Sequence, residues 1–145
     1  MELTTKYNGE GVLIEKGITD NGLKQGPWEF YFDSGKVHKL VHYSNDIKHG
    51  LFKRWYPNGS LAVECYYSNN KLDGPWREFY EHGKIREIGE YVNNQYRPLD
   101  FWNNQGEHTL IKGTGTKIET FGHSDSDVFE QYFENGEFIR ERKII

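Results

Sequence analysis

Aromatic and aliphatic residues recur along residues 26–91 at fixed distances from glycine. Three segments begin with a glycine, place an aromatic residue two positions later, end in an aromatic pair, and are followed by a second glycine and an aliphatic residue. The first glycines are Gly26, Gly50 and Gly74, each 24 residues after the one before, and the second are Gly35, Gly59 and Gly83. A fixed period in this range indicates a repeat architecture in which each unit packs on the next.

Each repeat has the pattern of one β-hairpin. A turn that contains glycine, such as Asp33-Ser34-Gly35, separates two runs rich in aromatic and β-branched residues. After the turn, residues alternate, which predicts a half-buried strand with Val37, Val41 and Tyr43 on one face. A polar turn, Ser44-Asn45-Asp46, then leads to the next glycine. We therefore predict an all-β protein, an elongated antiparallel meander of hairpins in one twisted sheet of about ten or eleven strands and about 45–50 Å.

The chain is long enough for one domain of 145 residues, and the repeat argues against two. We divide it into an N-terminal capping half repeat (1–25), three regular repeats (26–97), and degenerate repeats with a C-terminal cap (98–145). Terminal repeats are expected to be atypical because one of their sides has no neighbour. The last part keeps Phe101-Trp102 and Gly106 from the frame, and Asn135-Gly136 predicts a final hairpin.

Three aromatic positions occur once in each repeat. They are held by Trp28, Phe52 and Trp76, by Tyr31, Trp55 and Phe79, and by Phe32, Tyr56 and Tyr80. A lone sheet cannot bury both faces against itself, so one row should stay partly exposed. The rings are either cross-strand packing ladders or, as in many interfaces, binding hot spots. We predict that Tyr31, Trp55 and Phe79, with Trp102 farther along, face a protein partner.

Aligned in this way, the chain resembles the MORN-repeat family, in its longer-period variant common in bacterial proteins. The resemblance rests on the glycine and aromatic frame of residues 26–91, with frayed copies on both sides. It implies a binding module rather than an enzyme. Repeats of this family occur in antitoxin or immunity proteins, in scaffolds and in lipid-associated proteins. We expect an antitoxin or immunity protein that occludes a cognate bacterial toxin, with a scaffold or membrane-surface adaptor as the alternative.

Charge narrows the choice of partner. The net charge is −4, and no block of five basic residues supplies the positive surface that nucleic acid requires. Anionic lipid would also need clustered lysine and arginine, so we expect neither kind of partner. The segment 1–6 lacks the apolar core of a secretory signal, which predicts a cytoplasmic location. The acidic residues Asp125, Asp127 and Glu130 are predicted to steer a basic toxin toward the sheet.

The sequence contains few residue patterns that could support catalysis or metal binding. The six histidines have no metal-ligand spacing on one predicted face, and no Ser/His/Asp or Cys/His arrangement can be proposed. Cys65, the one cysteine, occupies the repeat position of Val41 and is expected to be a buried apolar residue. The sequence therefore predicts no catalytic residues, no cofactor and no metal.

Overall fold

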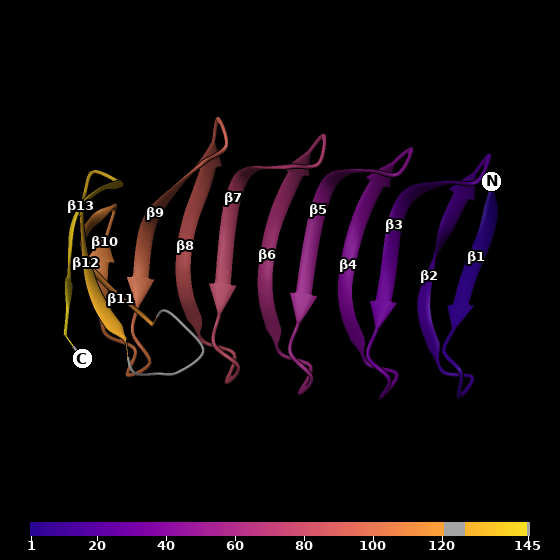
Figure 1. The fold of residues 1–145 in the computed structure, drawn as a ribbon, viewed down its shortest axis with the longest axis horizontal. Helices are drawn as coiled ribbons and strands as arrows, with labels where there is room; N and C mark the ends of the chain where they lie inside the picture. Colours follow the sequence, from indigo (N-terminus) through magenta and orange to yellow (C-terminus); the bar gives the residue numbers. More distant parts are fainter. Residues whose placement is uncertain (121–126, 145) are drawn as a thin grey trace.

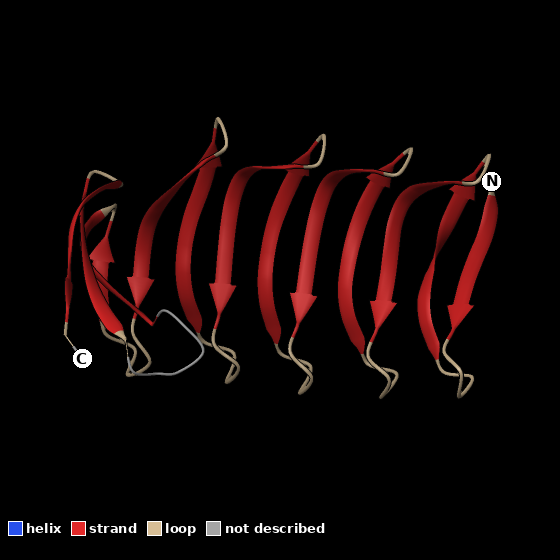
Figure 2. Ribbon diagram, in the orientation of Figure 1, coloured by secondary structure: helices blue, strands red, loops and turns tan. Residues whose placement is uncertain are grey.

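The computed structural model describes residues 1–120 and 127–144, which form thirteen strands and no helix (Figures 1 and 2). The strands are β1 (Glu2–Tyr7), β2 (Leu13–Asp20), β3 (Leu23–Tyr31), β4 (Val37–Ser44), β5 (Ile47–Trp55), β6 (Leu61–Ser68), β7 (Lys71–Phe79), β8 (Ile85–Val92), β9 (Gln95–Trp102), β10 (His108–Ile111), β11 (Thr114–Thr120), β12 (Val128–Glu134) and β13 (Glu137–Lys143). They pair antiparallel in chain order in one sheet. The predicted all-β hairpin meander is confirmed, with more strands than the ten or eleven expected. The described residues contain no helix that could cross a membrane.

Glycine turns join the two strands of each repeat at one edge of the sheet. In the first regular repeat, the amide of Phe32 donates to the carbonyl of Lys36, and the amide of Gly35 donates to the carbonyl of Phe32. Gly35 has a φ of 79°, a conformation that side chains with a Cβ disfavour. The same two hydrogen bonds recur in the turns at 56–60, 80–84 and 103–107, and also at 8–12. The expected opening unit therefore forms a complete hairpin with the turn of the regular repeats.

Two-residue turns join consecutive repeats at the opposite edge. Asn45 and Asp46 have φ values of 51° and 65°, and Asn69 and Asn70 have 50° and 66°, which asparagine and aspartate tolerate better than most residues. The Asp46 carboxylate also accepts a hydrogen bond of 2.8 Å from the amide of Lys24, the second residue of β3, just after the preceding turn. These polar turns therefore connect one hairpin to the next.

A bulge in each hairpin changes the face on which part of the second strand lies. Phe30 pairs with Lys39, but the next residue, Tyr31, pairs with Val37, so one residue of β4 is left over. Directly paired residues share a face. Val37 therefore lies on the face of Tyr31, opposite Val41, and the predicted grouping of Val37 with Val41 and Tyr43 is wrong. A strict alternation cannot anticipate one inserted residue.

One row of cross-strand partners defines what we call the inner face. It runs through Lys6, Glu15, Phe30, Lys39, Arg54, Val63, Glu78, Glu87, Phe101, Leu110, Gly115 and Phe133. Most of the buried apolar side chains, including Trp28, Val41, Cys65 and Leu110, lie on this face. We call the other side, which carries Tyr31, the outer face.

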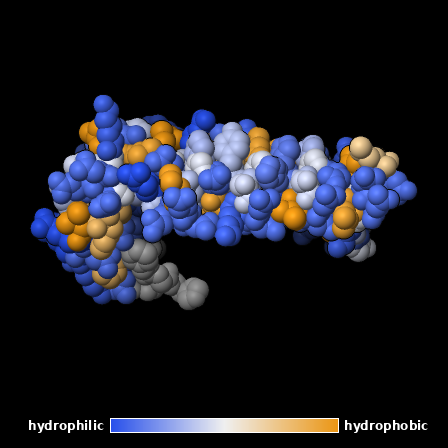
Figure 3. Space-filling model, turned by 90° about the horizontal axis from the view of Figure 1, so that it is seen from above, coloured by the Kyte–Doolittle hydropathy of each residue, from blue (hydrophilic) through white to orange (hydrophobic). Residues whose placement is uncertain are grey.

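The C-terminal end of the sheet bends toward the inner face. Lys117 on β11 contacts Glu87 on β8, although two strands separate β11 from β8 in the sheet, so the sheet must be concave on this side. Phe101, Leu110 and Phe133 form a buried cluster at the bend. Figure 3 shows the result, an elongated body with the C-terminal strands turned to one side. We call β1–β9 the long arm and β10–β13 the short arm.

Candidate binding surfaces

The four aromatic residues predicted to face a partner occupy one repeated position on the outer face. Tyr31 pairs with Val37, Trp55 with Leu61, Phe79 with Ile85, and Trp102 with His108. All four side chains are half-buried. The structure thus places them in a single row along the long arm, next to the glycine turns. We call this set the outer row.

Two shallow grooves lie along the outer row, in the same position two repeats apart. The first, of about 530 Å³, lies between the Gly35 turn and Trp55 and is also lined by Lys36 and Val37. The second, of about 260 Å³, lies between the turn at residues 80–84 and Trp102. Each combines an indole, aliphatic side chains and a lysine, namely Val37 and Leu40 in the first groove and Ile85 in the second, and these surfaces suit an apolar side chain of a partner.

The acidic residues predicted to steer a basic partner are largely neutralised. Asp127 forms an ion pair with Lys143, and the carboxylate of Glu130 accepts a hydrogen bond of 2.7 Å from Nε of Arg142. Asp125 lies outside the described residues. The cations come from β13, which pairs with β12 in the sheet. The expected acidic surface is therefore weaker than the sequence suggested, because its partners lie on the neighbouring strand.

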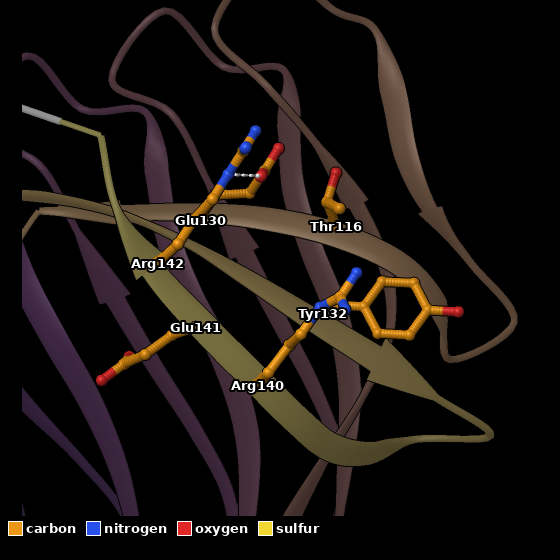
Figure 4. Close-up of a pocket in the computed structure, with 6 residues that line it drawn as sticks. All are labelled: Thr116, Glu130, Tyr132, Arg140, Glu141 and Arg142. Atoms are coloured by element: carbon orange, nitrogen blue, oxygen red, sulfur yellow. Dashed lines mark hydrogen bonds and ion pairs between the residues drawn. The ribbon is translucent and has the colours of Figure 1, made fainter.

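A further pocket, of about 500 Å³, lies on the short arm around this ion pair (Figure 4). Arg140 lies 5.4 Å from the centroid of the Tyr132 ring, and Arg142 pairs with Glu130, whereas Glu141 points away from both arginines (Figure 4). The lining of this pocket contains two arginines and two glutamates, so the pocket offers little unbalanced charge to a ligand.

A network of charged side chains fills the corner where the two arms meet. Glu87 is 2% exposed, and its carboxylate accepts hydrogen bonds from Lys117 Nζ at 2.8 Å and from the Tyr96 hydroxyl at 2.5 Å. Lys117 also pairs with Glu119 at 2.7 Å. Arg86 bridges Glu78 at 2.9 Å and Glu119 at 3.0 Å.

The pKa values in the corner follow from this network. Burial lowers the pKa of Lys117, but Glu87 and Glu119 outweigh burial and raise the pKa above its ordinary value. Burial, followed by the charge of Glu87, raises the pKa of Tyr96. Each charged side chain in the corner has a partner of opposite charge, so the network holds the short arm against the long arm.

Farther along the inner face, Lys39 and Arg54 are directly opposite each other on β4 and β5. Nζ of Lys39 lies 4.5 Å from the centroid of the Phe30 ring, and Arg54 is exposed. Neighbouring His38 stacks on Phe32 with ring centroids 4.3 Å apart. Burial, followed by the charges of Lys39 and Arg54, lowers the pKa of His38. This part of the inner face therefore carries positive charge.

Cys65 is buried, as predicted, and packs in a cluster with Val63 and Ala62. Burial, followed by the nearby Glu64 carboxylate, raises the pKa of the thiol to about 12. A thiol held in its protonated form is a poor nucleophile. Within residues 1–120 and 127–144, no three His, Cys, Asp or Glu side chains are grouped so as to hold a metal ion.

The comparisons with known proteins agree with this geometry. The MORN repeat variant matches residues 24–45, 48–69 and 72–93, three consecutive copies that coincide with the hairpins from β3 to β8. The hairpins within residues 24–93 are therefore MORN repeats, and their fold is that of a repeat module for binding. Among curated proteins, none matches the chain.

Sequence reasoning missed the corner network and the cationic pair. Both lie at positions where the repeats differ from one another. Phe30, Arg54 and Glu78 are equivalent, as are Lys39, Val63 and Glu87. The changes of charge within an otherwise constant frame are a signal that could have identified these positions.

Proposed function

We propose that this protein is a non-enzymatic protein-binding module that acts as an antitoxin or immunity protein, occluding a cognate bacterial toxin in the cytoplasm. The single observation that carries the binding role is the outer row, four half-buried rings at one repeated position with grooves beside Trp55 and Trp102. MORN repeats are generally protein-interaction modules, which supports a protein as the partner.

The outer row suits a protein partner because it combines large apolar area with little further ordering cost. Trp102 stacks on its cross-strand partner His108 with ring centroids 4.2 Å apart, and the other three rings are half-buried, so binding requires few side chains to be immobilised. Residues of this kind, in partly closed grooves, account for most of the binding energy in many interfaces. A toxin bound along the row would have its active site covered by the long arm.

Co-expression with the product of the neighbouring gene tests the proposal. We expect the neighbour to be toxic alone, to be harmless with this protein, and to copurify with it. Replacing both Trp55 and Phe79 by alanine should weaken the complex by about 2 kcal/mol or more, roughly thirtyfold, as measured by isothermal titration calorimetry. Tyr66→Ala is the matched control, since Tyr66 lies on the outer face, paired with Leu51, outside the outer row.

Each alternative gives a different result. A neighbour that is harmless alone, or that does not copurify, contradicts the antitoxin role. Unchanged affinity of the Trp55→Ala/Phe79→Ala variant contradicts the outer row as the contact surface. Co-sedimentation with anionic vesicles would favour the membrane-surface adaptor instead, and clustered basic residues would then have to supply the contact.

A further inference from the structure

The row of cross-strand partners that defines the inner face contains two pairs of like charges directly opposite each other. Lys39 faces Arg54 across β4 and β5, and Glu78 faces Glu87 across β7 and β8. Like charges in this arrangement destabilise a sheet. Lys39 and Arg54 belong to neighbouring repeats, whereas Glu78 and Glu87 belong to one hairpin, so a repulsion between like charges occurs once between cations and once between carboxylates. A chain that keeps such pairs must balance them elsewhere.

The acidic pair is balanced within the chain. Arg86 pairs with Glu78 at 2.9 Å, and Lys117 from the short arm pairs with Glu87 at 2.8 Å. The bend of the sheet thus supplies one of the cations from a strand that is distant in sequence. The carboxylates of Glu78 and Glu87 have no charge left to offer a partner molecule.

The basic pair has no such balance among residues 1–120 and 127–144, where no carboxylate forms an ion pair with Lys39 or Arg54. The outer face differs, because Lys53 and Arg77 both pair with Glu64 there. In a protein with a net charge of −4, two cations without a carboxylate partner, of which Lys39 lies over the Phe30 ring, form a local excess of positive charge on this face. Lys39 and Arg54 lie between Phe30 and Val63 in the same row.

We propose that Lys39 and Arg54 form a binding site on the inner face for the carboxylates of an acidic segment of a protein partner. The site lies on the opposite side of the sheet from the outer row and goes beyond the function proposed above. The guanidinium group of Arg54 can bind a carboxylate through two parallel hydrogen bonds, and the ammonium group of Lys39 adds a second charge. Phe30 and Phe32 provide apolar surface for the residues that flank the carboxylate.

The shape of the molecule favours a protein segment over a lipid surface. The short arm projects from the same face (Figure 3), so a flat bilayer cannot lie against the inner face along its whole length. An extended peptide or loop can enter the concave side. Nucleic acid would need several cations in a line, and the next residues of the row are Val63 and Glu78.

Binding of a fluorescein-labelled hexaglutamate peptide to the full chain tests the site. At low ionic strength, about 20 mM, fluorescence anisotropy should detect binding that weakens as salt is raised. We expect the Lys39→Gln/Arg54→Gln variant to bind at least tenfold more weakly. Its melting temperature should equal or exceed that of the wild type, because the variant loses a repulsion. The matched control is Lys16→Gln/Lys71→Gln, which removes two exposed lysines that form no ion pair in the described part of the chain.

Several results would overturn the site. The first is that the wild type does not bind hexaglutamate, and the second is that the test and control variants lose equal affinity for it. The third is a lower melting temperature of the test variant, which would mean that contacts within the chain stabilise Lys39 and Arg54. Binding of phosphatidylserine vesicles, lost in the same variant, would assign the site to lipid instead. The result is separable from the antitoxin proposal, because Lys39→Gln/Arg54→Gln leaves the outer row intact.

Discussion

Gly17 illustrates how a single residue fixes the packing of the first repeats. It lies on β2 beneath the indole of Trp28, and a Cβ at this position would overlap the indole ring. Trp28 is 2% exposed, and its Nε1 donates a hydrogen bond of 2.9 Å to the carbonyl of Ile18. The ring is therefore fixed by a hydrogen bond as well as by packing, and it cannot move aside without breaking that bond.

Gly17→Ala should consequently destabilise the protein. The added methyl group forces the indole out of its site, and overpacking of this kind costs about 1–3 kcal/mol. Urea denaturation followed by tryptophan fluorescence measures the loss. Gly9→Ala is the control, because nothing lies within 4 Å of a Cβ at Gly9, and its cost should stay within about 0.5 kcal/mol. Equal costs for the two variants would mean that the loss of glycine's backbone freedom, rather than the indole, sets the effect.

At the scale of the hairpin, the polar turns bond to one another in some repeats and not in others. The Asn70 side chain accepts a hydrogen bond of 2.8 Å from the amide of Lys48, the second residue of β5, just after the preceding turn. Asn94 occupies the same position one repeat later with a φ of 64°, close to the 66° of Asn70. No such bond from Asn94 is found among the described residues. The amide of Asn70 also donates to the carbonyl of Lys48 at 2.9 Å, so the two turns differ in a pair of hydrogen bonds while sharing a backbone conformation.

Asn70→Gly should lower the free energy of unfolding by about 0.5–1 kcal/mol more than Asn94→Gly, because glycine keeps the conformation and removes the acceptor. Asn70→Ala should cost about 1 kcal/mol beyond Asn70→Gly, because alanine resists positive φ. Thermal and urea unfolding of the three variants measure these differences. If Asn70→Gly and Asn94→Gly behave alike, the bond between turns contributes nothing to stability.

The strands and their pairing could be predicted from the sequence where the pattern of glycine and aromatic residues repeats. The pairing of Phe52 with Cys65 follows from glycine and aromatic positions written three times, so strands β3–β8 could be predicted. The bulge that moves Val37 to the outer face inserts one residue into β4, and no particular residue type indicates its position in the sequence. The neutralisation of Glu130 by Arg142 was also missed, since their register depends on the last turn. The sequence therefore predicted the repeated frame but not the contacts that differ between copies.

At the scale of the whole molecule, the bend between the arms depends on contacts that no periodicity announces. Lys117 and Glu87 are 30 residues apart, and neither belongs to the repeat signature. Their side chains are 10% and 3% exposed, so removing one leaves the other buried without its counter-charge. We predicted one elongated, twisted sheet, and the repeats alone contain no signal for a bend near its C-terminal end. The charge network, together with the buried Phe101, Leu110 and Phe133, supplies that reason.

Lys117→Met should therefore cost about 3 kcal/mol, and hydrogen exchange should become faster in the short arm than in the long arm. Adding Glu87→Gln should recover much of this loss, because the buried carboxylate is then neutral. Arg142→Met, which removes an exposed cation from Glu130, is the control and should cost less than about 1 kcal/mol.

The dependence on pH gives a second, independent measurement of the same contact. The pKa of Lys117 is raised in the folded state, so its contribution is fully present below the ordinary lysine pKa and is lost as pH rises through the folded value. The difference in stability between wild type and Lys117→Met should stay constant from neutral pH to the ordinary lysine pKa and shrink at higher pH. If the difference in stability shrinks toward acidic pH instead, the effect belongs to a carboxylate. In the hydrogen-exchange experiment on Lys117→Met, equal rates in both arms would mean that the corner does not hold the bend.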